Sequence, residues 1–344
     1  MDYRRLEKVL IIKPSSLGDV IHALPVASAL KAALPAVGID WVVGRGYEGV
    51  LEGNPAIGRV IVFDRNMLKG PGWSGRLMGF LRELRREHYD LVIDLQGLLR
   101  SGLITAACMA DRSMGFANAR EGATLFYTEL VPVPATNIHA VDRYMLTLAH
   151  IGINTASPCE FSIRLSGEDR AEADALLEEF GIRPGEPFAA FAPSARWDTK
   201  RWPAANFVEV ADRIHKGRGL KPVFVGTADE ARLMDGVPDA PACRGGMAFG
   251  RTTLKVLGAL LSRASVLVTN DSGPMHMAAA AGTPVVAVFG PTDPGKTGPY
   301  GDRHRVLTAD IECRPCFRRS CDNVKCLSGV TAEQVYEAAS SIIG

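Results

Sequence analysis

The chain has 344 residues, of which 47% are apolar and 22% are charged, and its formal net charge is +1. These values describe an ordinary soluble globular chain with room for about two domains, each with its own core. The near-neutral balance excludes a bulk electrostatic attraction to nucleic acid, so an anionic partner has to be bound by a local basic site.

The amino-terminal residues carry too short an apolar run for a secretory signal, and Glu7 and Lys8 interrupt its approach. No stretch approaches the ~18 apolar residues that are needed to span a bilayer. We therefore expect a cytoplasmic protein without a transmembrane segment, which meets a membrane only from one side. Seven cysteines in a cytosolic chain argue against a disulfide framework.

The first half of the sequence alternates short apolar strands with helices. We expect strands over residues 9–13, 39–43, 60–63 and 91–95, and helices over residues 20–34, 74–87 and 139–151. This alternation predicts an α/β domain with a parallel sheet.

A small polar loop follows the first strand. Ser15, Ser16 and Gly18 keep this loop small enough for a substrate to approach its backbone, and Asp19 lies near the start of the next helix. As a helix cap, Asp19 stabilises the helix by about 1 kcal/mol. A carboxylate on such a loop can also take a proton from a hydroxyl nucleophile, and we favour this second interpretation.

The run from Gly44 to Gly49 spells G-x-G-x-x-G, and Asp64 lies 20 residues after Gly44. This offset is the one expected of a dinucleotide-binding domain, so a nucleotide-dependent oxidoreductase is an alternative function. We reject it because Asn54 and Pro55 end the following helix within a couple of turns. Tight NAD(H) binding is the observation that would restore it.

Basic residues also follow strand or loop signals in the first half. Arg100 comes after the strand over 91–95, and Arg120 follows a later loop. From such positions a basic side chain can reach an anionic ligand.

The second half repeats the alternation. We expect strands over residues 188–191, 222–225, 265–269 and 285–289, and helices over residues 167–180, 204–216, 253–262, 275–281 and 331–343. The domains are predicted to span residues 1–165 and 166–330. The closing segment, residues 331–344, is expected to form a helix that packs back on the amino-terminal domain.

The stretch around Asp271 carries the strongest functional signal. Asp271, Ser272 and Gly273 connect the strand over 265–269 to a helix that begins near Pro274 and contains His276. Backbone N–H groups and the positive end of the helix dipole make such a junction an anion site, most often for phosphate. The alternative is an ordinary βαβ unit with well-capped ends.

Polar residues after two neighbouring strands extend this site. Ser194 can donate to a phosphate and Lys200 can supply the compensating charge, both after the strand over 188–191. Asp229 and Glu230 follow the strand over 222–225, where an acid commonly accepts hydrogen bonds from ribose hydroxyls. Ligands of α/β sheets bind at these carboxyl ends of strands.

The tail contains Cys313, Cys316, Cys321 and Cys326, in the spacing C-x2-C-x4-C-x4-C. One C-x2-C pair suits tetrahedral zinc, but the remaining spacing is looser than in usual zinc knuckles. A structural metal, reduced thiols and disulfides remain open as alternatives.

Several segments together resemble the family 9 glycosyltransferases, the bacterial ADP-heptose–lipopolysaccharide heptosyltransferases. The resemblance covers nearly the whole chain, and two further segments are more similar to heptosyltransferase I than to II. The matching segments are KPSSLGDVIHALP (13–25), DLVIDLQGLLRSGLI (90–104), HAVDR (139–143), KRW (200–202), NDSGPMH (270–276) and GPTDPGKTGPYG (290–301), with WVVGRGYEGV (41–50) and REGATLFY (120–127) carrying the subtype.

The resemblance implies a GT-B fold, in which two facing Rossmann-like domains bind the acceptor on the first and the nucleotide sugar on the second. It implies an inverting, metal-independent transfer of heptose from ADP-heptose to a Kdo sugar of the lipid A inner core, by a protein peripheral at the inner face of the inner membrane. No cofactor is implied for catalysis. Heptosyltransferase II, or another family 9 enzyme with a different acceptor, is the alternative within the family, and a non-catalytic nucleotide-sugar sensor is one outside it.

Carried over by motif, Asp19 is the base. The resemblance implies that the diphosphate is bound by Lys200, Asp271, Ser272 and Gly273, and the ribose by Glu230 or Asp229. Ser194 and His276 complete the predicted donor site. Arg100 and Arg120 meet the acidic Kdo and the lipid A phosphates, beside Ser15, Ser16 and Gly18.

Overall fold

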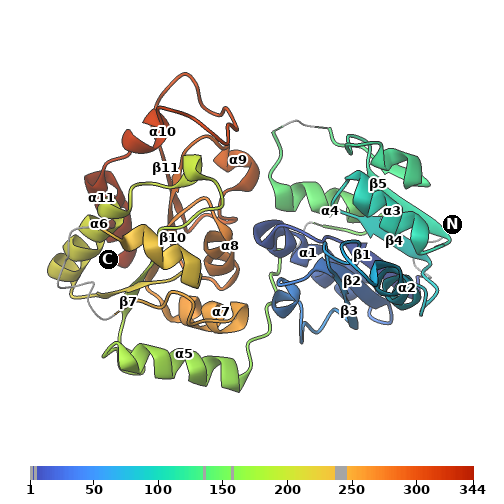
Figure 1. The fold of residues 1–344 in the computed structure, drawn as a ribbon, viewed down its shortest axis with the longest axis horizontal. Coiled ribbons are helices and arrows are strands. Elements are labelled where there is room, and N and C mark those ends of the chain that lie inside the picture. Colours follow the sequence, from blue (N-terminus) through green and yellow to red (C-terminus); the bar gives the residue numbers. More distant parts are fainter. Residues whose placement is uncertain (1–2, 4–5, 135–136, 156–158, 237–245) are drawn as a thin grey trace. The chain divides into compact units, whose positions relative to one another are not determined.

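The computed structural model describes residues 3, 6–134, 137–155, 159–236 and 246–344. The chain divides between Arg164 and Leu165 into two compact units, and each is described by itself (Figure 1). This division lies one residue before the predicted domain boundary.

The first unit is a six-stranded parallel sheet with helices on both faces, as the alternating sequence predicted. The strand order is β3-β2-β1-β4-β5-β6. Helices α1 and α4 lie against each other, and α2 and α3 share an apolar cluster that includes Phe80 and Ile104. The elements are β1 (Lys8–Ile12), α1 (Leu17–Ala33), β2 (Gly38–Gly44), η2 (Glu48–Val50), β3 (Arg59–Phe63), α2 (Trp73–Leu84), β4 (Leu91–Asp94), α3 (Leu99–Ala107), β5 (Arg112–Phe116), η3 (Ala123–Phe126), β6 (Glu129–Val131) and α4 (Ala140–His150).

The second unit is a five-stranded parallel sheet in the order β11-β10-β9-β7-β8. Helix α7 packs against α5 and α8, and α6 packs against α11. The elements are α5 (Gly167–Glu179), β7 (Phe188–Ala192), η4 (Asp198–Lys200), α6 (Ala204–Arg218), β8 (Lys221–Phe224), η5 (Ala228–Met234), α7 (Leu254–Arg263), β9 (Val266–Asn270), α8 (Gly273–Ala280), β10 (Val285–Phe289), α9 (Pro294–Thr297), β11 (Arg305–Thr308), α10 (Lys325–Ser328) and α11 (Ala332–Ile343).

Each sheet reverses its strand order at one point. In the first unit β1 pairs with both β2 and β4, and in the second unit β7 pairs with both β8 and β9. Connections leave such a point in opposite directions, which opens a crevice outside the carboxyl ends of the two strands. The loops after β1 and β4, and those after β7 and β9, are therefore the places where ligand groups are expected.

The central strands are buried apolar runs. β1, β7, β9 and β10 are almost wholly inaccessible to solvent, because helices cover both faces of a parallel sheet. Their β-branched and aromatic side chains suit this environment. Among the described residues, no helix is both long and apolar enough to cross a membrane.

The closing helix corrects one expectation. Helix α11 packs within the second unit rather than on the first, as shown by Val335 and Ala339, which are buried in the core of the second unit against α6, together with Phe207 and Ile214. The second unit accordingly extends to Gly344. An amphipathic terminal helix shows that it has an apolar face, but sequence alone does not say which core covers that face.

Other differences concern element ends and edge strands. Helix α1 begins at Leu17 rather than at residue 20, which places Gly18 and Asp19 inside its first turn. The interior strand β5 and the edge strands β6 and β11 were not predicted, since their short sequences lack a continuous apolar run. After the Gly44 loop the described chain forms only η2 before β3, and Arg45 pairs with Asp64 at 2.9 Å. A dinucleotide site needs a full helix after that loop, so the rejection of this motif agrees with the structure.

Candidate active site

Asp19 lies at the reversal point of the first sheet, where α1 begins. Ser16 is the N-cap residue, and the Asp19 Oδ2 atom accepts hydrogen bonds from the Ser16 backbone N–H at 2.9 Å and from its hydroxyl at 2.8 Å. The two residues thus form a capping box. Asp19 therefore does take part in capping α1, the first of the two roles considered from the sequence, and these hydrogen bonds orient its carboxylate.

The second oxygen of Asp19 faces a cation and a phenol. The Tyr144 hydroxyl of α4 lies 3.3 Å from Oδ1, and the Lys13 Nζ atom lies 4.0 Å from it. Lys13 follows β1 and donates to the Leu95 carbonyl at 3.2 Å. The Lys13 side chain is 4% exposed and that of Asp19 is 36% exposed, so the carboxylate is the member of the pair that reaches solvent.

Burial dominates the acid–base properties beneath Asp19. It lowers the pKa of Lys13, against the opposing attraction of Asp19 and Asp94. Burial also raises the pKa of Tyr144 well above its ordinary value, so this phenol stays protonated and can donate to Asp19.

A second carboxylate supports the neighbouring loop. Asp94, at the end of β4, accepts from the Gln96 and Gly97 backbone N–H groups at 2.8 and 3.2 Å and from the Tyr127 hydroxyl at 2.6 Å. Burial raises the pKa of Asp94. Because the Gly97 carbonyl accepts from the Arg120 N–H at 2.9 Å, this carboxylate also helps to position the loop that carries Arg120.

The predicted acceptor residues lie in this unit, with different surroundings. Arg65 donates to the Ser15 hydroxyl at 2.8 Å. Arg100 is exposed, with its guanidinium carbon 5.9 Å from the centre of the Phe63 ring, and Arg120 is also exposed. Gly18 is buried in the first turn of α1, away from the loop where it was predicted to act.

In the second unit Lys200 and Asp271 meet at the reversal point. Lys200 ends the short helix η4 after β7, and Asp271 follows β9; their Nζ and Oδ2 atoms are 2.6 Å apart. The same Oδ2 atom accepts from the Thr292 hydroxyl at 2.6 Å. Asp271 is 5% exposed and Lys200 is 16% exposed, so here the ammonium is the more accessible member.

Asn270 joins the two loops that carry this pair. Its amide donates to the Pro193 carbonyl at 2.7 Å and accepts from the Trp202 backbone N–H at 3.0 Å. Ser194 lies beside this junction in the sequence and is buried. Lys200 also lies over the Trp197 ring, 4.6 Å from its centre, which adds a cation–π contact.

Helix α8 begins next to Asp271. Ser272 is its N-cap residue, Gly273 its first residue, and Pro274 suits the first turn because it lacks an N–H that would need a partner. The Ser272 and Thr269 hydroxyls are 3.3 Å apart. His276, which we predicted to bind the donor, is buried in this helix.

The two acids predicted for ribose binding differ. Glu230 Oε2 accepts from the Thr227 backbone N–H at 2.7 Å and so closes its own loop after β8, whereas Asp229 is exposed. Both residues lie in η5, at the carboxyl edge of the second sheet.

The cysteine tail braces the loop after β10. Arg314 donates to the Gly290 and Thr292 carbonyls at 2.5 and 3.3 Å, and the Cys316 and Phe317 N–H groups donate to the Pro291 carbonyl. The six cysteines of the described residues are free thiols. No three of the tail cysteines, all of which lie in the described part of the chain, bring their sulfurs within 4.8 Å of one another. A structural metal at this tail stays a prediction.

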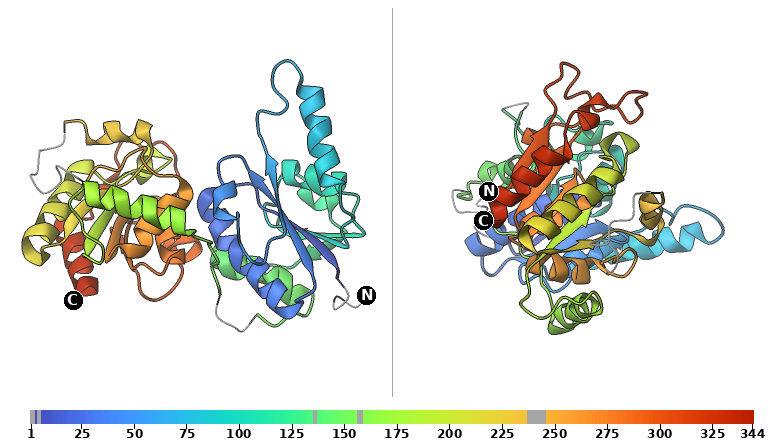
Figure 2. Two further views of the ribbon diagram at one scale, coloured as in Figure 1. Left: turned by 90° about the horizontal axis from the view of Figure 1, so that it is seen from below. Right: turned by 90° about the vertical axis from the view of Figure 1, so that its left-hand side faces the viewer.

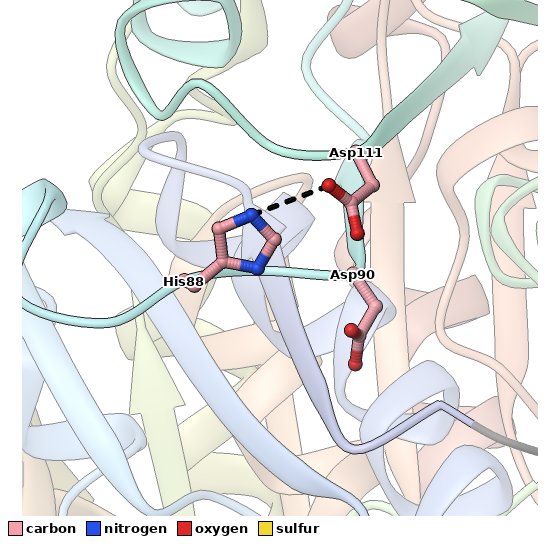
Figure 3. Close-up of side chains that lie close together, drawn as sticks. All are labelled: His88, Asp90 and Asp111. Carbon is pink, nitrogen blue, oxygen red and sulfur yellow. Dashed lines mark ion pairs between the residues drawn. The ribbon is translucent and has the colours of Figure 1, made fainter.

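One group of metal-ligating side chains does gather in the described part of the chain. His88, Asp90 and Asp111 lie together, with His88 Nε2 3.2 Å from Asp111 Oδ1 (Figure 3). Asp90 Oδ2 accepts from the Glu7 and Lys8 N–H groups at 2.7 Å each. Asp90 and Asp111 precede β4 and β5, so the group lies at the amino edge of the sheet, away from the reversal point. We assign it to the joining of these chain segments.

Three contributors to the two sites were missed. Lys13 was quoted only as part of a motif, although an ionisable residue that closes a buried apolar strand is itself a signal of function. Tyr144 gave no signal, because one tyrosine in an amphipathic helix resembles core. Asn270 was quoted only as part of the polar turn and the motif after its strand, although a polar side chain that closes a buried strand is a signal in its own right.

Comparisons with known proteins agree with this arrangement. Residues 77–327 match the model of glycosyltransferase family 9 (heptosyltransferase). Lipopolysaccharide heptosyltransferase 1 of Pseudomonas aeruginosa is 33% identical over 325 residues, which cover 91% of this chain and 87% of the relative.

Two solved structures share the fold over nearly their full length. A family 9 glycosyl transferase from Veillonella parvula has a TM-score of 0.82 at 28% identity, covering 99% of this chain and 97% of that one. The Escherichia coli heptosyltransferase WaaC with ADP has a TM-score of 0.78 at 26% identity, covering 97% and 99%. These matches confirm the predicted GT-B fold class and the predicted family. From the two reversal points and these similarities together, we conclude that the chain is a glycosyltransferase and belongs to glycosyltransferase family 9, the heptosyltransferases.

Proposed function

We propose that the protein transfers heptose from ADP-heptose to the Kdo inner core of lipopolysaccharide, as a heptosyltransferase of type I. The observation that carries this proposal is the Lys200 ammonium, held at 2.6 Å by the buried Asp271 beside the start of α8. An oriented cation beside a helix N-terminus suits the diphosphate of a nucleotide sugar. The similarity to WaaC, which has been solved with ADP, supports the same donor.

In this proposal Lys200 and the Ser272 and Gly273 backbone N–H groups bind the diphosphate and stabilise its charge as ADP leaves. Asp271 does not bind the anion, because a carboxylate repels it. Asp271 instead holds Lys200 in place. The charge that develops on the leaving group is thereby met by protein groups, each contributing about 1–3 kcal/mol.

The remaining donor contacts follow the sheet edge. Asp229 is the better candidate for the ribose hydroxyls, because Glu230 already accepts from the Thr227 N–H. Ser194 is proposed to support the phosphate loop after β7. Because the side chain of His276 is buried, we propose that it contributes to the donor site by supporting the start of α8 from within the protein.

Asp19 is proposed as the base. An acceptor hydroxyl attacks the anomeric carbon of heptose, its proton passes to Asp19, and the bond from that carbon to the ADP oxygen breaks with inversion. Asp19 is suited to this role because its carboxylate reaches solvent while the buried Lys13 and Tyr144 fix its orientation. The ionised form is the one that accepts a proton.

The acceptor is proposed to bind the first unit. Arg100 and Arg120 are exposed cations that match the Kdo carboxylate and lipid A phosphates, and Ser15 and Ser16 line the loop before Asp19. Such an acceptor resides in a membrane, so we propose that the protein acts peripherally at the inner face of the inner membrane. Nucleic acid has no place in this function.

The test is a transfer assay with purified protein, ADP-heptose and Kdo-lipid A, run with and without EDTA. We expect EDTA to leave product formation unchanged, because in this proposal Lys200 and the start of α8 neutralise the charge of the diphosphate without a metal ion. Loss of transfer on chelation would contradict the metal-independent mechanism, and metal analysis of the same sample tests the cysteine tail.

The acceptor defines the subtype. Kdo-lipid A that already carries one heptose is the matched alternative substrate, and preferential transfer to it would identify the protein as heptosyltransferase II. Failure of both acceptors with ADP-heptose would overturn the proposed function.

A further inference from the structure

The first unit exposes large apolar side chains on one layer of helices. Of the eleven large apolar residues that are exposed in the described chain, seven lie between residues 68 and 125: Leu68, Trp73, Met78, Leu99, Leu103, Met109 and Leu125. Trp73 and Met78 on α2 are 49% and 50% exposed, and Leu103 on α3 is 52% exposed. Single exposed apolar residues are ordinary, but a concentration on one layer indicates an interaction surface.

The elements that carry these residues are packed side by side. α2 and α3 contribute to the same apolar cluster on the sheet, and the Arg85 Nε atom donates to the Ala107 carbonyl at the end of α3, at 2.9 Å. Gly102 of α3 lies against the Phe126 ring of η3, where an added Cβ would come within 2.5 Å. α2, α3 and η3 therefore form one continuous layer.

Several of the exposed apolar residues lie on α3 and on the side of α2 next to it. Leu99 and Leu103 are four residues apart on α3 and share a stripe of that helix. Met78 lies seven residues before Arg85 and shares the stripe of α2 that borders α3. Figure 2 shows α2 and the loop before it projecting from the sheet of this unit, in light blue in the left view.

The basic residues of this layer are concentrated on α2 and the loop before it. Residues 65–86 contain six basic side chains and one acid, a local charge of +5 in a chain of net charge +1: Arg65, Lys69, Arg76, Arg82, Arg85 and Arg86 against Glu83. Glu83 is paired with Arg59 at 3.0 Å. Lys69, Arg82 and Arg86 are exposed and form no ion pair with any residue that the structure describes.

We propose that the outer surface of α2, α3 and η3 docks on the anionic surface of a lipid bilayer. Apolar side chains ringed by cations are the pattern of peripheral membrane binding, in which the apolar groups enter the interface and the cations meet lipid phosphates. Tryptophan favours this interface. The inference rests on the proposed function, whose acceptor is a membrane lipid, and it names the surface that brings the protein to that lipid.

The test is co-sedimentation of the full-length protein with phosphatidylcholine vesicles, with and without phosphatidylglycerol. Two double variants probe the surface: Trp73→Ser with Leu103→Ser, and Arg82→Glu with Arg86→Glu. The matched control is Arg170→Glu with Val306→Ser, two exposed positions of the second unit. We expect the wild type and the control to bind the anionic vesicles in a salt-dependent manner, and each surface variant to bind at least about tenfold more weakly.

Activity separates this inference from the proposed function. With a deacylated, water-soluble acceptor, the surface variants should retain kcat/KM within about twofold, because none of the four residues belongs to the proposed site. With the acceptor in vesicles, transfer should fall together with binding. Thermal unfolding confirms that the variants are folded.

Each outcome decides one proposal. Surface variants that sediment like the wild type overturn the docking surface and leave the transferase intact. Vesicle binding by a wild type that transfers to no acceptor overturns the transferase alone. A third outcome is that the wild type is a dimer by light scattering, whereas the surface variants are monomers that still bind vesicles. That result would make this layer a subunit interface and overturn the docking proposal.

Discussion

The two units each hold a lysine and an aspartate at the reversal point of a parallel sheet, but with opposite burial. In the first unit the lysine is buried and Asp19 reaches solvent; in the second Asp271 is buried and the lysine is more accessible. The pairs also differ in distance, 4.0 Å for Lys13 and Asp19 against 2.6 Å for Lys200 and Asp271.

This difference shows how one pair of residue types can serve two purposes. The buried member is committed to its partner, since a buried charge without a counter-ion is costly. The exposed member is the one that a ligand meets. The first pair therefore presents a carboxylate, suited to accept a proton, and the second presents an ammonium, suited to bind a diphosphate.

Asp19→Asn breaks the first pair and is expected to have the largest effect. The amide keeps an oxygen that can accept from Ser16, so the capped start of α1 survives, but it cannot act as a base. We expect transfer to fall by about 100-fold or more, with donor affinity unchanged. Steady-state transfer rates and calorimetric titration of ADP-heptose measure the two quantities, and a nearly active variant would remove the base assignment.

Lys200→Met breaks the second pair from its exposed side. Loss of a charged hydrogen bond to the diphosphate should weaken ADP-heptose binding by about 10- to 100-fold. Lys200→Arg should recover part of the loss because it keeps the charge. Lys216→Met, an exposed lysine on α6, is the control, and unchanged affinity in Lys200→Met would refute the role of Lys200.

Asp271→Asn tests whether the buried member only positions its partner. The change leaves Lys200 without its counter-ion, so the free energy of unfolding should fall by about 1–3 kcal/mol. Donor affinity should fall by less than in Lys200→Met, because Asp271 does not touch the anion. Urea unfolding and titration of ADP-heptose test both points; an affinity loss larger than that of Lys200→Met would place Asp271 in contact with the donor.

Lys13→Met is expected to have the smallest effect, which is a change in how the free energy of unfolding depends on pH. Because burial makes the pKa of Lys13 lower in the folded protein than in the unfolded chain, the unfolded chain binds more protons in the alkaline interval between the two values. Stability contributed by this group therefore rises with pH across that interval, which ends near the unfolded value of about 10.4.

The variant should lack this rise, as measured by urea unfolding at several alkaline pH values. Lys216→Met again serves as the control, since its side chain is exposed in the folded protein. If the free energy of unfolding changed with pH equally in Lys13→Met and in the wild type, burial would not be what sets the pKa of Lys13.

Much of the architecture was predictable because it is encoded locally. Apolar β-branched runs such as residues 265–269 and 285–289 specify buried strands, and Asp271-Ser272-Gly273-Pro274 specifies a helix start. Local patterns are weaker in the edge strands β6 and β11, which are short and partly exposed, and in the buried strand β5, where Ser113 and Gly115 interrupt the apolar run. They are also silent on long-range packing, which explains the wrong partner expected for α11.

The sequence by itself determined the two-part α/β organisation, the family and the positions of Asp19, Lys200 and Asp271 near strand ends, because spacing along a chain encodes strands, caps and motifs. Only the tertiary structure decided which charges are buried. It brought Tyr144 to Asp19 across 125 residues and Thr292 to Asp271 across 21, and it closed Glu230 on its own loop. The burial of a charged side chain, and its distance from its partner, are set only when segments far apart in the sequence pack together. These two quantities decide whether a carboxylate is able to accept a proton or holds a lysine in place.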